Sequence, residues 1–312
     1  MKFHLLVAAA LTSGLLASCG GGGGNAGGPA PVVTASSAST ARYSDPMLIT
    51  LTGSNLDQAL TLTSTGCKNF ARSTTAPFVS SATVAYYTCT VSGGAGSLTV
   101  NVSGGGTTVA TVPFTVAQPQ VTMLVNNGAG VSGTLVITLR PQEAPITVDN
   151  FLAYVKTGFY NGTVFHRHGR TVTSGPFVLQ GGGFTGPLTA GTVFPAAKPA
   201  SAPIALEASR GLSNLRYTLA MARTSVLNSA TSQFFINTVD NAFLDTSGGG
   251  YAVFGTITTG TTVVDAMVAA PCTLSPVNFD AGVSSPPPPG FVPSTDCLPV
   301  PNLVIASATQ SQ

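Results

Sequence analysis

The sequence predicts a mainly β protein of two domains, a small sandwich followed by a closed barrel that carries two helices. Its 312 residues suffice for about two domains at ~100–200 residues each. Hydrophobic residues make up 44% of the chain, which supports a buried core and excludes disorder along the whole length. Runs of alternating or β-branched residues recur between turns rich in Gly, Ser and Asn, and such short, closely spaced strands are typical of sandwiches and barrels.

The chain carries few charges for its length. Charged residues make up 7% of it, against roughly 25% in an ordinary globular protein. With 12 basic and 10 acidic side chains, the chain creates no strong field that would hold a nucleic acid or an anionic membrane surface. We therefore expect no nucleic-acid partner. A weakly charged surface of Thr, Ser and Gly is instead common in exported β proteins.

The N-terminus has the pattern of an export signal. A short positive start precedes an apolar run too brief to span a bilayer, so residues 1–18 are predicted to be a signal peptide. The ending Leu16–Cys19 resembles the bacterial lipobox, which implies a lipid on the sulfur of Cys19; a chance cysteine is the alternative. Residues 19–31 are Gly-rich and predict a flexible tether. We expect a lipid-anchored periplasmic protein, in the outer membrane of a Gram-negative bacterium because glycine follows the cysteine.

Four further cysteines fall into two pairs along the chain. Sequence proximity favours the disulfides Cys67–Cys89 and Cys272–Cys297, one in each half, as expected in an oxidising compartment. No CxxC motif occurs and histidines are scarce, so the spacing is unlike that of a zinc site. We expect no metal.

Residues 32–117 predict a small β-sandwich of immunoglobulin-like type. Five stretches alternate or are β-branched: residues 47–52, 59–63, 83–91, 97–102 and 107–116. Turn residues separate them. The segment contains no histidine and only two acidic residues, so it offers no set of side chains for catalysis. We interpret it as a spacer, with a substrate-contacting or surface-attachment module as the alternatives.

Residues 120–312 predict a barrel whose ends are closed by helices. Pro145 opens a helix that Gly158 ends. Its apolar residues recur on one face: Val148, Phe151, Leu152 and Val155. The other elements predicted with most support are a strand over 133–139, a helix over 262–268 and a closing strand over 303–308.

Five blocks of this second domain resemble the signature of the cyclophilins, in the order of that family. They are residues 158–167, 177–182, 220–223, 228–236, and 243–245 with 250–255. The resemblance covers roughly residues 121–309. It implies a peptidyl-prolyl cis-trans isomerase folded as an eight-stranded antiparallel barrel with two helices. It also implies that no cofactor is needed, because the reaction is a rotation about a bond.

The residues at the matching positions suit that chemistry. An X–Pro bond resists rotation with a barrier of ~18–20 kcal/mol, and a hydrogen bond to the prolyl nitrogen stabilises the twisted state more than the planar one. By the resemblance, Arg167 is the catalytic donor, Gln180 supports it and Phe235 forms part of the proline pocket. The resemblance gives the other substrate-binding residues as Phe177, Val178, Ala222, Gln233, Phe243, Leu244 and Tyr251.

The implied partners are proline-containing segments of unfolded or envelope proteins, and we expect a monomer. Two stretches depart from the family pattern. We interpret His168–Pro176, which is longer than usual, as a bulge into solvent, with shaping access to the groove as the alternative. We interpret the Pro-rich insertion 271–301 as a spacer, with a partner motif or a decoy for the groove as the alternatives. If such departures impair catalysis, the chain is a non-catalytic peptide-binding module or holdase.

Overall fold

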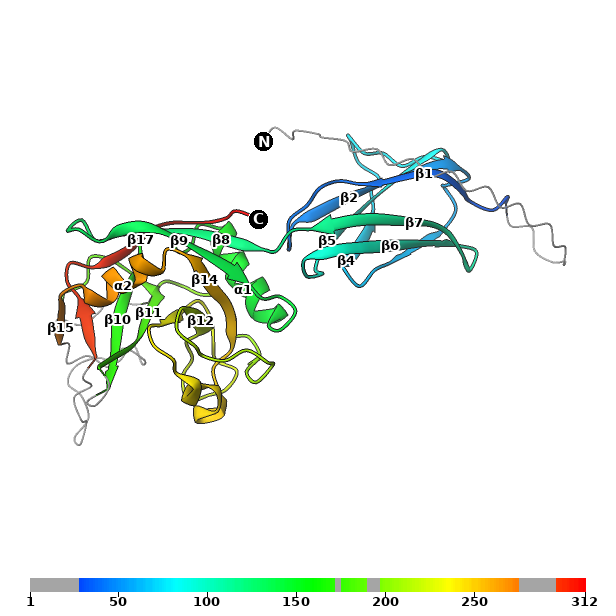
Figure 1. Ribbon diagram of the computed structural model, residues 1–312. Helices are drawn as coiled ribbons and strands as arrows, with labels where there is room; N and C mark the ends of the chain where they lie inside the picture. The colour runs from blue at the N-terminus through cyan, green and yellow to red at the C-terminus, as the bar shows by residue number, and fades with distance from the viewer. Residues whose placement is uncertain (1–27, 172–174, 190–196, 275–295) are drawn as a thin grey trace. The chain divides into compact units, whose positions relative to one another are not determined.

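A computed structural model of the chain describes residues 28–171, 175–189, 197–274 and 296–312 (Figure 1). The chain divides into two compact units, the first ending at Gln118 and the second beginning at Pro119. The predicted signal peptide, Cys19 and most of the Pro-rich insertion lie outside the described residues.

The first unit is a sandwich of two antiparallel sheets, as predicted. The four-stranded sheet has the order β1 (Val32–Ala38), β2 (Pro46–Ser54), β5 (Val84–Val91) and β4 (Cys67–Arg72), and the three-stranded sheet has the order β3 (Leu60–Thr63), β6 (Gly96–Gly104) and β7 (Thr107–Val116). Every second side chain of β5 is buried, which is the pattern of a strand with one face on the core. Strands β1 and β4 were not predicted, because their Ser-rich and polar sequences show no clear alternation.

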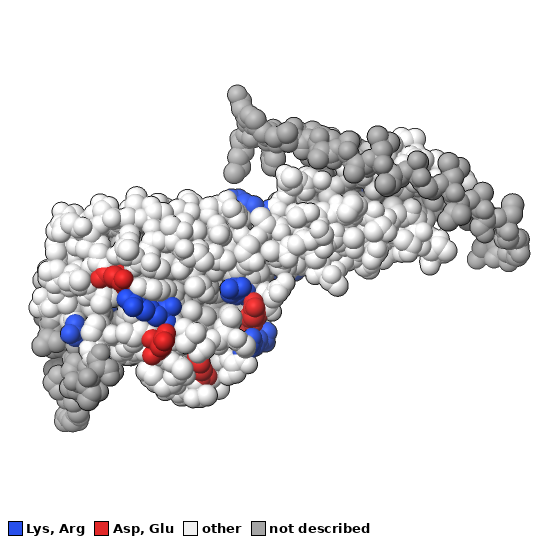
Figure 2. Space-filling view, in the orientation of Figure 1, with Lys and Arg blue, Asp and Glu red and all other residues white. Residues whose placement is uncertain are grey.

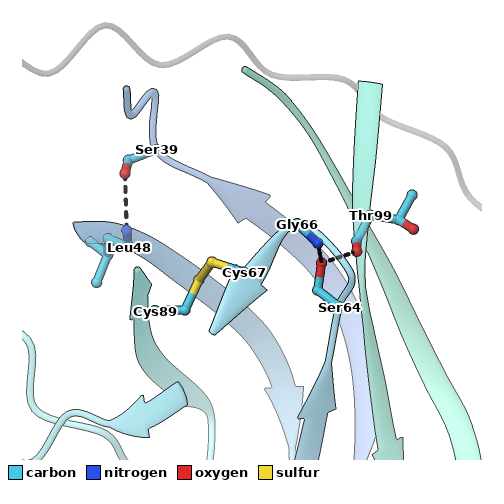
Figure 3. Close-up of a disulfide and its surroundings, with 7 residues drawn as sticks. All are labelled: Ser39, Leu48, Ser64, Gly66, Cys67, Cys89 and Thr99. Carbon is cyan, nitrogen blue, oxygen red and sulfur yellow. Dashed lines mark hydrogen bonds between the residues drawn. A yellow bond between two sulfur atoms is a disulfide. The ribbon is translucent and has the colours of Figure 1, made fainter. Parts of the chain in front are cut away.

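The predicted disulfide Cys67–Cys89 is confirmed and joins β4 to β5 (Figure 3). Just before Cys67, the hydroxyl of Ser64 accepts a hydrogen bond from the backbone N–H of Gly66 at 2.9 Å and donates one to the carbonyl of Thr99 at 2.7 Å. These two bonds tie the turn before β4 to β6 of the other sheet. A disulfide that closes a loop of this length stabilises a fold by roughly 3 kcal/mol in the chain-entropy model.

The second unit contains a closed barrel of eight antiparallel strands, which confirms the expectation from the resemblance (Figure 1). In order around the barrel, the described strands are β8 (Gln120–Asn126), β9 (Ser132–Leu139), β14 (Val253–Thr259), β12 (Thr218–Met221), β13 (Phe234–Asn237), β11 (Gly175–Thr185), β10 (Thr163–Thr171) and β17 (Leu303–Gln310). The ring closes because β10 pairs with both β11 and β17.

Both predicted helices are confirmed. Helix α1 (Pro145–Lys156) packs against β17, and α2 (Thr261–Ala269) packs against β9. At the start of α1 the buried Glu207 carboxylate accepts hydrogen bonds from the backbone N–H and the hydroxyl of Thr147, at 2.8 and 2.9 Å. The N–H groups in the first turn of a helix have no acceptor within the helix, and this carboxylate accepts from one of them. Its negative charge also interacts favourably with the helix dipole at the N-terminus. Phe151 of α1 contacts three buried rings, those of Tyr160, Phe234 and Phe254.

The described ends of His168–Pro176 do not bulge into solvent, contrary to the expectation. These ends continue β10 and β11 as a paired ladder, in which His168 is opposite Leu179 and Arg170 is opposite Pro176. His168 is only 1% exposed. The physical reason is that pairing satisfies backbone N–H and C=O groups that a bulge would leave to water.

The ends of the Pro-rich insertion also form strands, β15 (Cys272–Leu274) and β16 (Cys297–Pro299). These two strands pair with each other, and the predicted disulfide Cys272–Cys297 joins them. β16 in turn pairs with β10 on the edge of β10 that faces away from β11, and Cys297 is opposite His168 there. Both stretches that depart from the family pattern therefore meet at one place on the barrel.

The surface carries few charges, as the low content of charged residues predicts. On the face shown in Figure 2 most of the surface is uncharged, and the acidic and basic side chains in view lie mainly on the second unit. None of the helices within the described residues is long and apolar enough to cross a bilayer.

Candidate active site

Neighbouring strands place the three expected catalytic residues in one row across the barrel wall. Arg167 on β10 is opposite Gln180 on β11, and Gln180 is opposite Phe235 on β13. Residues directly opposite each other in antiparallel strands present their side chains on the same face of the sheet. The register therefore brings together three residues that are up to 68 positions apart (235 minus 167) along the chain.

Hydrogen bonds join the polar members of this row. Nη1 of Arg167 donates to Oε1 of Gln180 at 2.8 Å, and Nε2 of Gln180 donates to Oε1 of Gln233 at 2.9 Å. Gln180 is buried, whereas 19% of the Arg167 side chain is exposed. The buried amide is thus held from both sides, and it holds a guanidinium that reaches the surface.

An apolar cluster lies beside the row. Its buried members are Val178, Ala220, Phe235, Leu244 and Val253, and its partly buried members are Phe177, Leu212, Ala222 and Tyr251. Six of the ten residues expected at the site belong to this cluster, while Arg167, Gln180 and Gln233 form the polar chain. Partly buried apolar side chains next to a fixed cation offer a surface for an apolar ring.

Phe243 is the one expected residue outside both groups. It lies on the short helix η1 (Ala242–Asp245) and is 56% exposed, while the next residue, Leu244, is buried in the cluster. The ring of Phe243 lies 6.2 Å from that of Phe177, measured between centroids. Phe243 therefore stands at the rim of the apolar cluster.

A buried polar network anchors the backbone around the cluster. Nδ2 of Asn241 donates to the carbonyl of Phe177 at 2.8 Å. The carboxylate of Asp245 accepts hydrogen bonds from the backbone and the side chain of Asn214, both at 2.8 Å, and from the hydroxyl of Ser213. Burial acts to raise the pKa of Asp245, but these hydrogen bonds outweigh it and the pKa is lowered. The segments that carry Phe177 and η1 are thereby fixed.

Asp296 is a residue at this site that the sequence analysis missed. Its Oδ2 accepts a hydrogen bond from Nε of Arg167 at 2.6 Å, and its Oδ1 accepts one from the backbone N–H of Arg170 at 2.8 Å. The Asp296 side chain is only 8% exposed. The one signal in the sequence was its place next to Cys297, and nothing in the spacing connected it with Arg167.

The two histidines near Arg167 are buried and neutral. Burial lowers the pKa of His166 to about 3, and the charge of Arg167 adds to that effect. Burial also lowers the pKa of His168 to about 4, with Arg170 acting in the same direction and Asp296 against it. Neither side chain reaches the surface to exchange a proton with a substrate. This agrees with a reaction that needs no general base.

One group of described residues has the composition of a metal site. The ligand atoms of His168, Cys272 and Cys297 lie within 4.8 Å of one another. The two sulfurs are bonded to each other in the disulfide, and a metal binds the thiolate form of cysteine. In its oxidised form this group therefore lacks two of the three donors.

Comparison with known proteins identifies the family. The model of the family described as "Cyclophilin type peptidyl-prolyl cis-trans isomerase/CLD" matches residues 121–280, half of the chain. All ten residues expected at the site lie within this match, and Asp296 lies beyond it.

Curated relatives carry the same activity in their names. "Peptidyl-prolyl cis-trans isomerase cyp18" of Streptomyces antibioticus is 50% identical over 141 residues, which are 44% of this chain and 78% of that protein. "Peptidyl-prolyl cis-trans isomerase B" of Escherichia coli is 48% identical over 138 residues, 43% of this chain and 77% of that protein. The chain belongs to the cyclophilin-type peptidyl-prolyl cis-trans isomerases, and it is an enzyme that isomerises X–Pro peptide bonds.

Proposed function

We propose that this isomerase uses Arg167, Gln180 and Phe235 as its catalytic residues and acts on proline-containing segments of envelope proteins. The observation that carries the site assignment is the row that joins the guanidinium of Arg167 through Gln180 to the apolar cluster. Arg167 is held by Gln180, and Gln180 is directly opposite Phe235 of that cluster. Phe177 and Leu244 form the proline pocket together with Phe235, and Ala222 and Gln233 line the groove for the peptide backbone.

The mechanism follows from what rotation about an X–Pro bond requires. Amide resonance keeps the bond planar, and at the twisted state the prolyl nitrogen regains its lone pair. A donor that reaches this nitrogen stabilises the twisted state more than either planar isomer, and only this difference speeds the rotation. A guanidinium has five N–H donors in a rigid plane, so one edge of the Arg167 head group can be anchored on Gln180 while another faces the peptide.

The apolar cluster is suited to hold the proline ring. Each methylene group that leaves water contributes about 0.8 kcal/mol, so the three ring methylenes contribute roughly 2 kcal/mol. Apolar walls also exclude water and strengthen the hydrogen bond from the guanidinium. Ala222 carries a side chain small enough for a peptide backbone to approach, and its N–H is bonded to the carbonyl of Gln233 at 3.0 Å.

The pocket assignment predicts an effect of Phe177→Ala on substrate binding. The ring of Phe177 is partly buried in the cluster and its truncation removes apolar contact with the proline, so we expect KM for a short Ala-Pro peptide to rise about tenfold, or ~1.4 kcal/mol. The measurement is isomerisation at several peptide concentrations. Phe78→Ala, on a partly exposed phenylalanine of the first unit, is the control and keeps the wild-type KM. An unchanged KM in Phe177→Ala would contradict the assignment.

The proposed location is the cell envelope, with the protein anchored through a lipid on Cys19. The support is the export pattern of residues 1–18 and the lipobox-like ending before Cys19. Residues 20–28 then supply a Gly-rich tether, and the first unit acts as a spacer because its sequence offers no catalytic set. In this arrangement the isomerase meets exported chains that fold near the membrane.

The lipid anchor predicts a loss of membrane attachment in Cys19→Ser. Cells that express the full chain and receive labelled palmitate are expected to give a labelled protein in the membrane fraction. The serine variant is expected to be unlabelled and to leave that fraction, because serine has no sulfur to carry the lipid. The double variant Cys67→Ser/Cys89→Ser is the control and stays labelled. A labelled Cys19→Ser protein would show that this cysteine is not the anchor.

A further inference from the structure

We propose that Asp296 is a positioning residue of the isomerase, which the Cys272–Cys297 disulfide holds against Arg167 and which fixes the guanidinium for catalysis. The proposal rests on the role of Arg167 proposed above. It concerns a residue beyond the part of the chain that the family model matches.

The carboxylate of Asp296 spans two donors on β10. Oδ2 accepts from Nε of Arg167 at 2.6 Å, and Oδ1 accepts from the backbone N–H of Arg170 at 2.8 Å. The opposite side of the guanidinium is bound as well, because Nη1 donates to Gln180 at 2.8 Å. Two acceptors, Gln180 on β11 and Asp296 just before β16, thus determine both the position and the plane of the Arg167 head group.

The ion pair lies mostly out of water. The exposed fraction is 8% for the Asp296 side chain and 19% for that of Arg167. Charge-assisted hydrogen bonds are shorter and stronger than neutral ones, and they weaken less where water is excluded. An exposed ion pair would exchange freely with solvent, whereas this one restricts the arginine to one geometry.

Asp296 is itself fixed by the residues that follow it. Cys297 pairs with His168 of β10 and is bonded to Cys272, which comes just after α2. Leu298 is fully buried in a cluster with Val164 and Phe184. The residue before Cys297 is therefore held at the side of β10 by a covalent bond, by strand pairing and by apolar burial.

Asp296 connects the two stretches that depart from the family pattern. Arg170 belongs to the continuation of β10 that the longer His168–Pro176 stretch provides, and Asp296 belongs to the insertion 271–301. Each departure supplies one side of the hydrogen bond between Arg170 and Asp296. The described end of the insertion at Asp296 is therefore more than a spacer, because it and the continued β10 together support Arg167.

The physical benefit is preorganisation. Arginine has a long flexible side chain, and ordering it at the moment of reaction costs conformational entropy. A guanidinium that is already aimed at the prolyl nitrogen avoids this cost in the twisted state. The effect of Asp296 is thus expected on kcat, with little change in KM, since the proline ring is bound by the apolar cluster.

The first test is Asp296→Asn in the full chain. Asparagine has one oxygen and one NH2 group, so it keeps one of the two acceptor contacts and replaces the other with a donor facing a donor. We expect kcat for an Ala-Pro peptide to fall about tenfold, with KM within twofold of wild type. The control is Asp265→Asn, which breaks an exposed pair with Arg216 on the same unit and keeps wild-type activity.

A double variant separates positioning from a structural role. If Asp296 acts through Arg167, Asp296→Asn causes no further loss when Arg167 is already alanine; a general weakening of the fold would lower the residual activity by the same tenfold factor in both backgrounds. Enough enzyme is used to keep the residual rate above the uncatalysed one. Additive losses would overturn the proposal.

Removal of the disulfide tests the same point without touching Asp296. We expect Cys272→Ser/Cys297→Ser to lower kcat severalfold, because the segment that carries Asp296 loses its covalent tie. Cys67→Ser/Cys89→Ser, in the first unit, is the matched control and keeps wild-type kcat. Circular dichroism verifies the folding of each variant.

The outcomes distinguish this proposal from the one on which it rests. If Arg167→Ala is inactive while Asp296→Asn and the Cys272/Cys297 variant both match wild type, the positioning role is wrong and the site assignment stands. If Arg167→Ala keeps full activity, the site assignment is wrong and the positioning role falls with it. Loss of kcat in both Asp296→Asn and the disulfide variant, absent in their controls, supports the proposal.

Discussion

Arg167→Ala is expected to lower kcat/KM for a short Ala-Pro peptide by about 100-fold or more. Removal of one preorganised donor from a site that stabilises a transition state costs about 100- to 1,000-fold in other enzymes. Arg167 is the guanidinium that Gln180 holds beside the apolar cluster, and alanine leaves no donor in its place. The measurement is the rate of cis-to-trans conversion in wild type and variant at equal concentration.

Two further variants make this result specific. Arg167→Lys keeps the positive charge but loses the planar set of donors, so we expect it to recover little of the activity. Arg216→Ala removes an arginine that is also paired with an aspartate on the same unit, and it is expected to keep wild-type activity. Equal rates for Arg167→Ala and wild type would show that another group supplies the stabilising hydrogen bond.

Local patterns predicted both helices and two of the eight barrel strands, over residues 133–139 and 303–308, and the resemblance supplied the rest of the barrel. The α1 helix was predictable because Pro145 and Gly158 mark its ends and the apolar residues between them repeat on one face. The site residues followed from short blocks that resemble a known family. The structure adds the register, which places Arg167, Gln180 and Phe235 in one row. Register depends on pairing between distant strands, and alternation within one strand does not specify it.

Contacts between distant parts of the chain also explain why Asp296 was not predicted. Asp296 is 129 residues from Arg167 along the chain, and no local pattern indicates which side chains such a separation brings together. The bulge expected at His168–Pro176 is not seen at the described ends of that stretch for a related reason. The expectation came from a length greater than the family's usual one, but β11 and β16 offer backbone partners on both sides of β10. The length of a connection does not show whether its ends pair with neighbouring strands.

Mild acid is expected to destabilise the second unit through its two buried histidines. His166 and His168 are buried, and burial lowers their pKa values to about 3 and about 4 from an ordinary value of 6.5. Well above pH 6.5, neither the folded nor the unfolded chain binds protons at these rings, so the rings do not make stability depend on pH there. Between pH 6.5 and about 4 the unfolded chain binds protons that the folded chain does not, so stability falls as the pH falls.

The expected size follows from the two shifts. At pH 5 each histidine lowers the free energy of unfolding by about 2 kcal/mol relative to pH 7.5. Together the two histidines lower the free energy of unfolding of the second unit by about 4 kcal/mol. That is a large part of the ~5–15 kcal/mol by which a typical domain is stable. Urea unfolding at pH 7.5 and pH 5, followed by circular dichroism and fitted as two transitions, measures the change for each unit.

The chain provides its own controls for this result. The described part of the first unit, residues 28–118, contains no histidine, so its transition is expected to move little between these two pH values. His168→Gln cannot be protonated in this range and is expected to halve the loss in the second unit, to about 2 kcal/mol. If the second unit is equally stable at pH 5 and pH 7.5, the histidines are accessible to protons in the folded state. In that case the burial that keeps them neutral beside Arg167 is not maintained in solution.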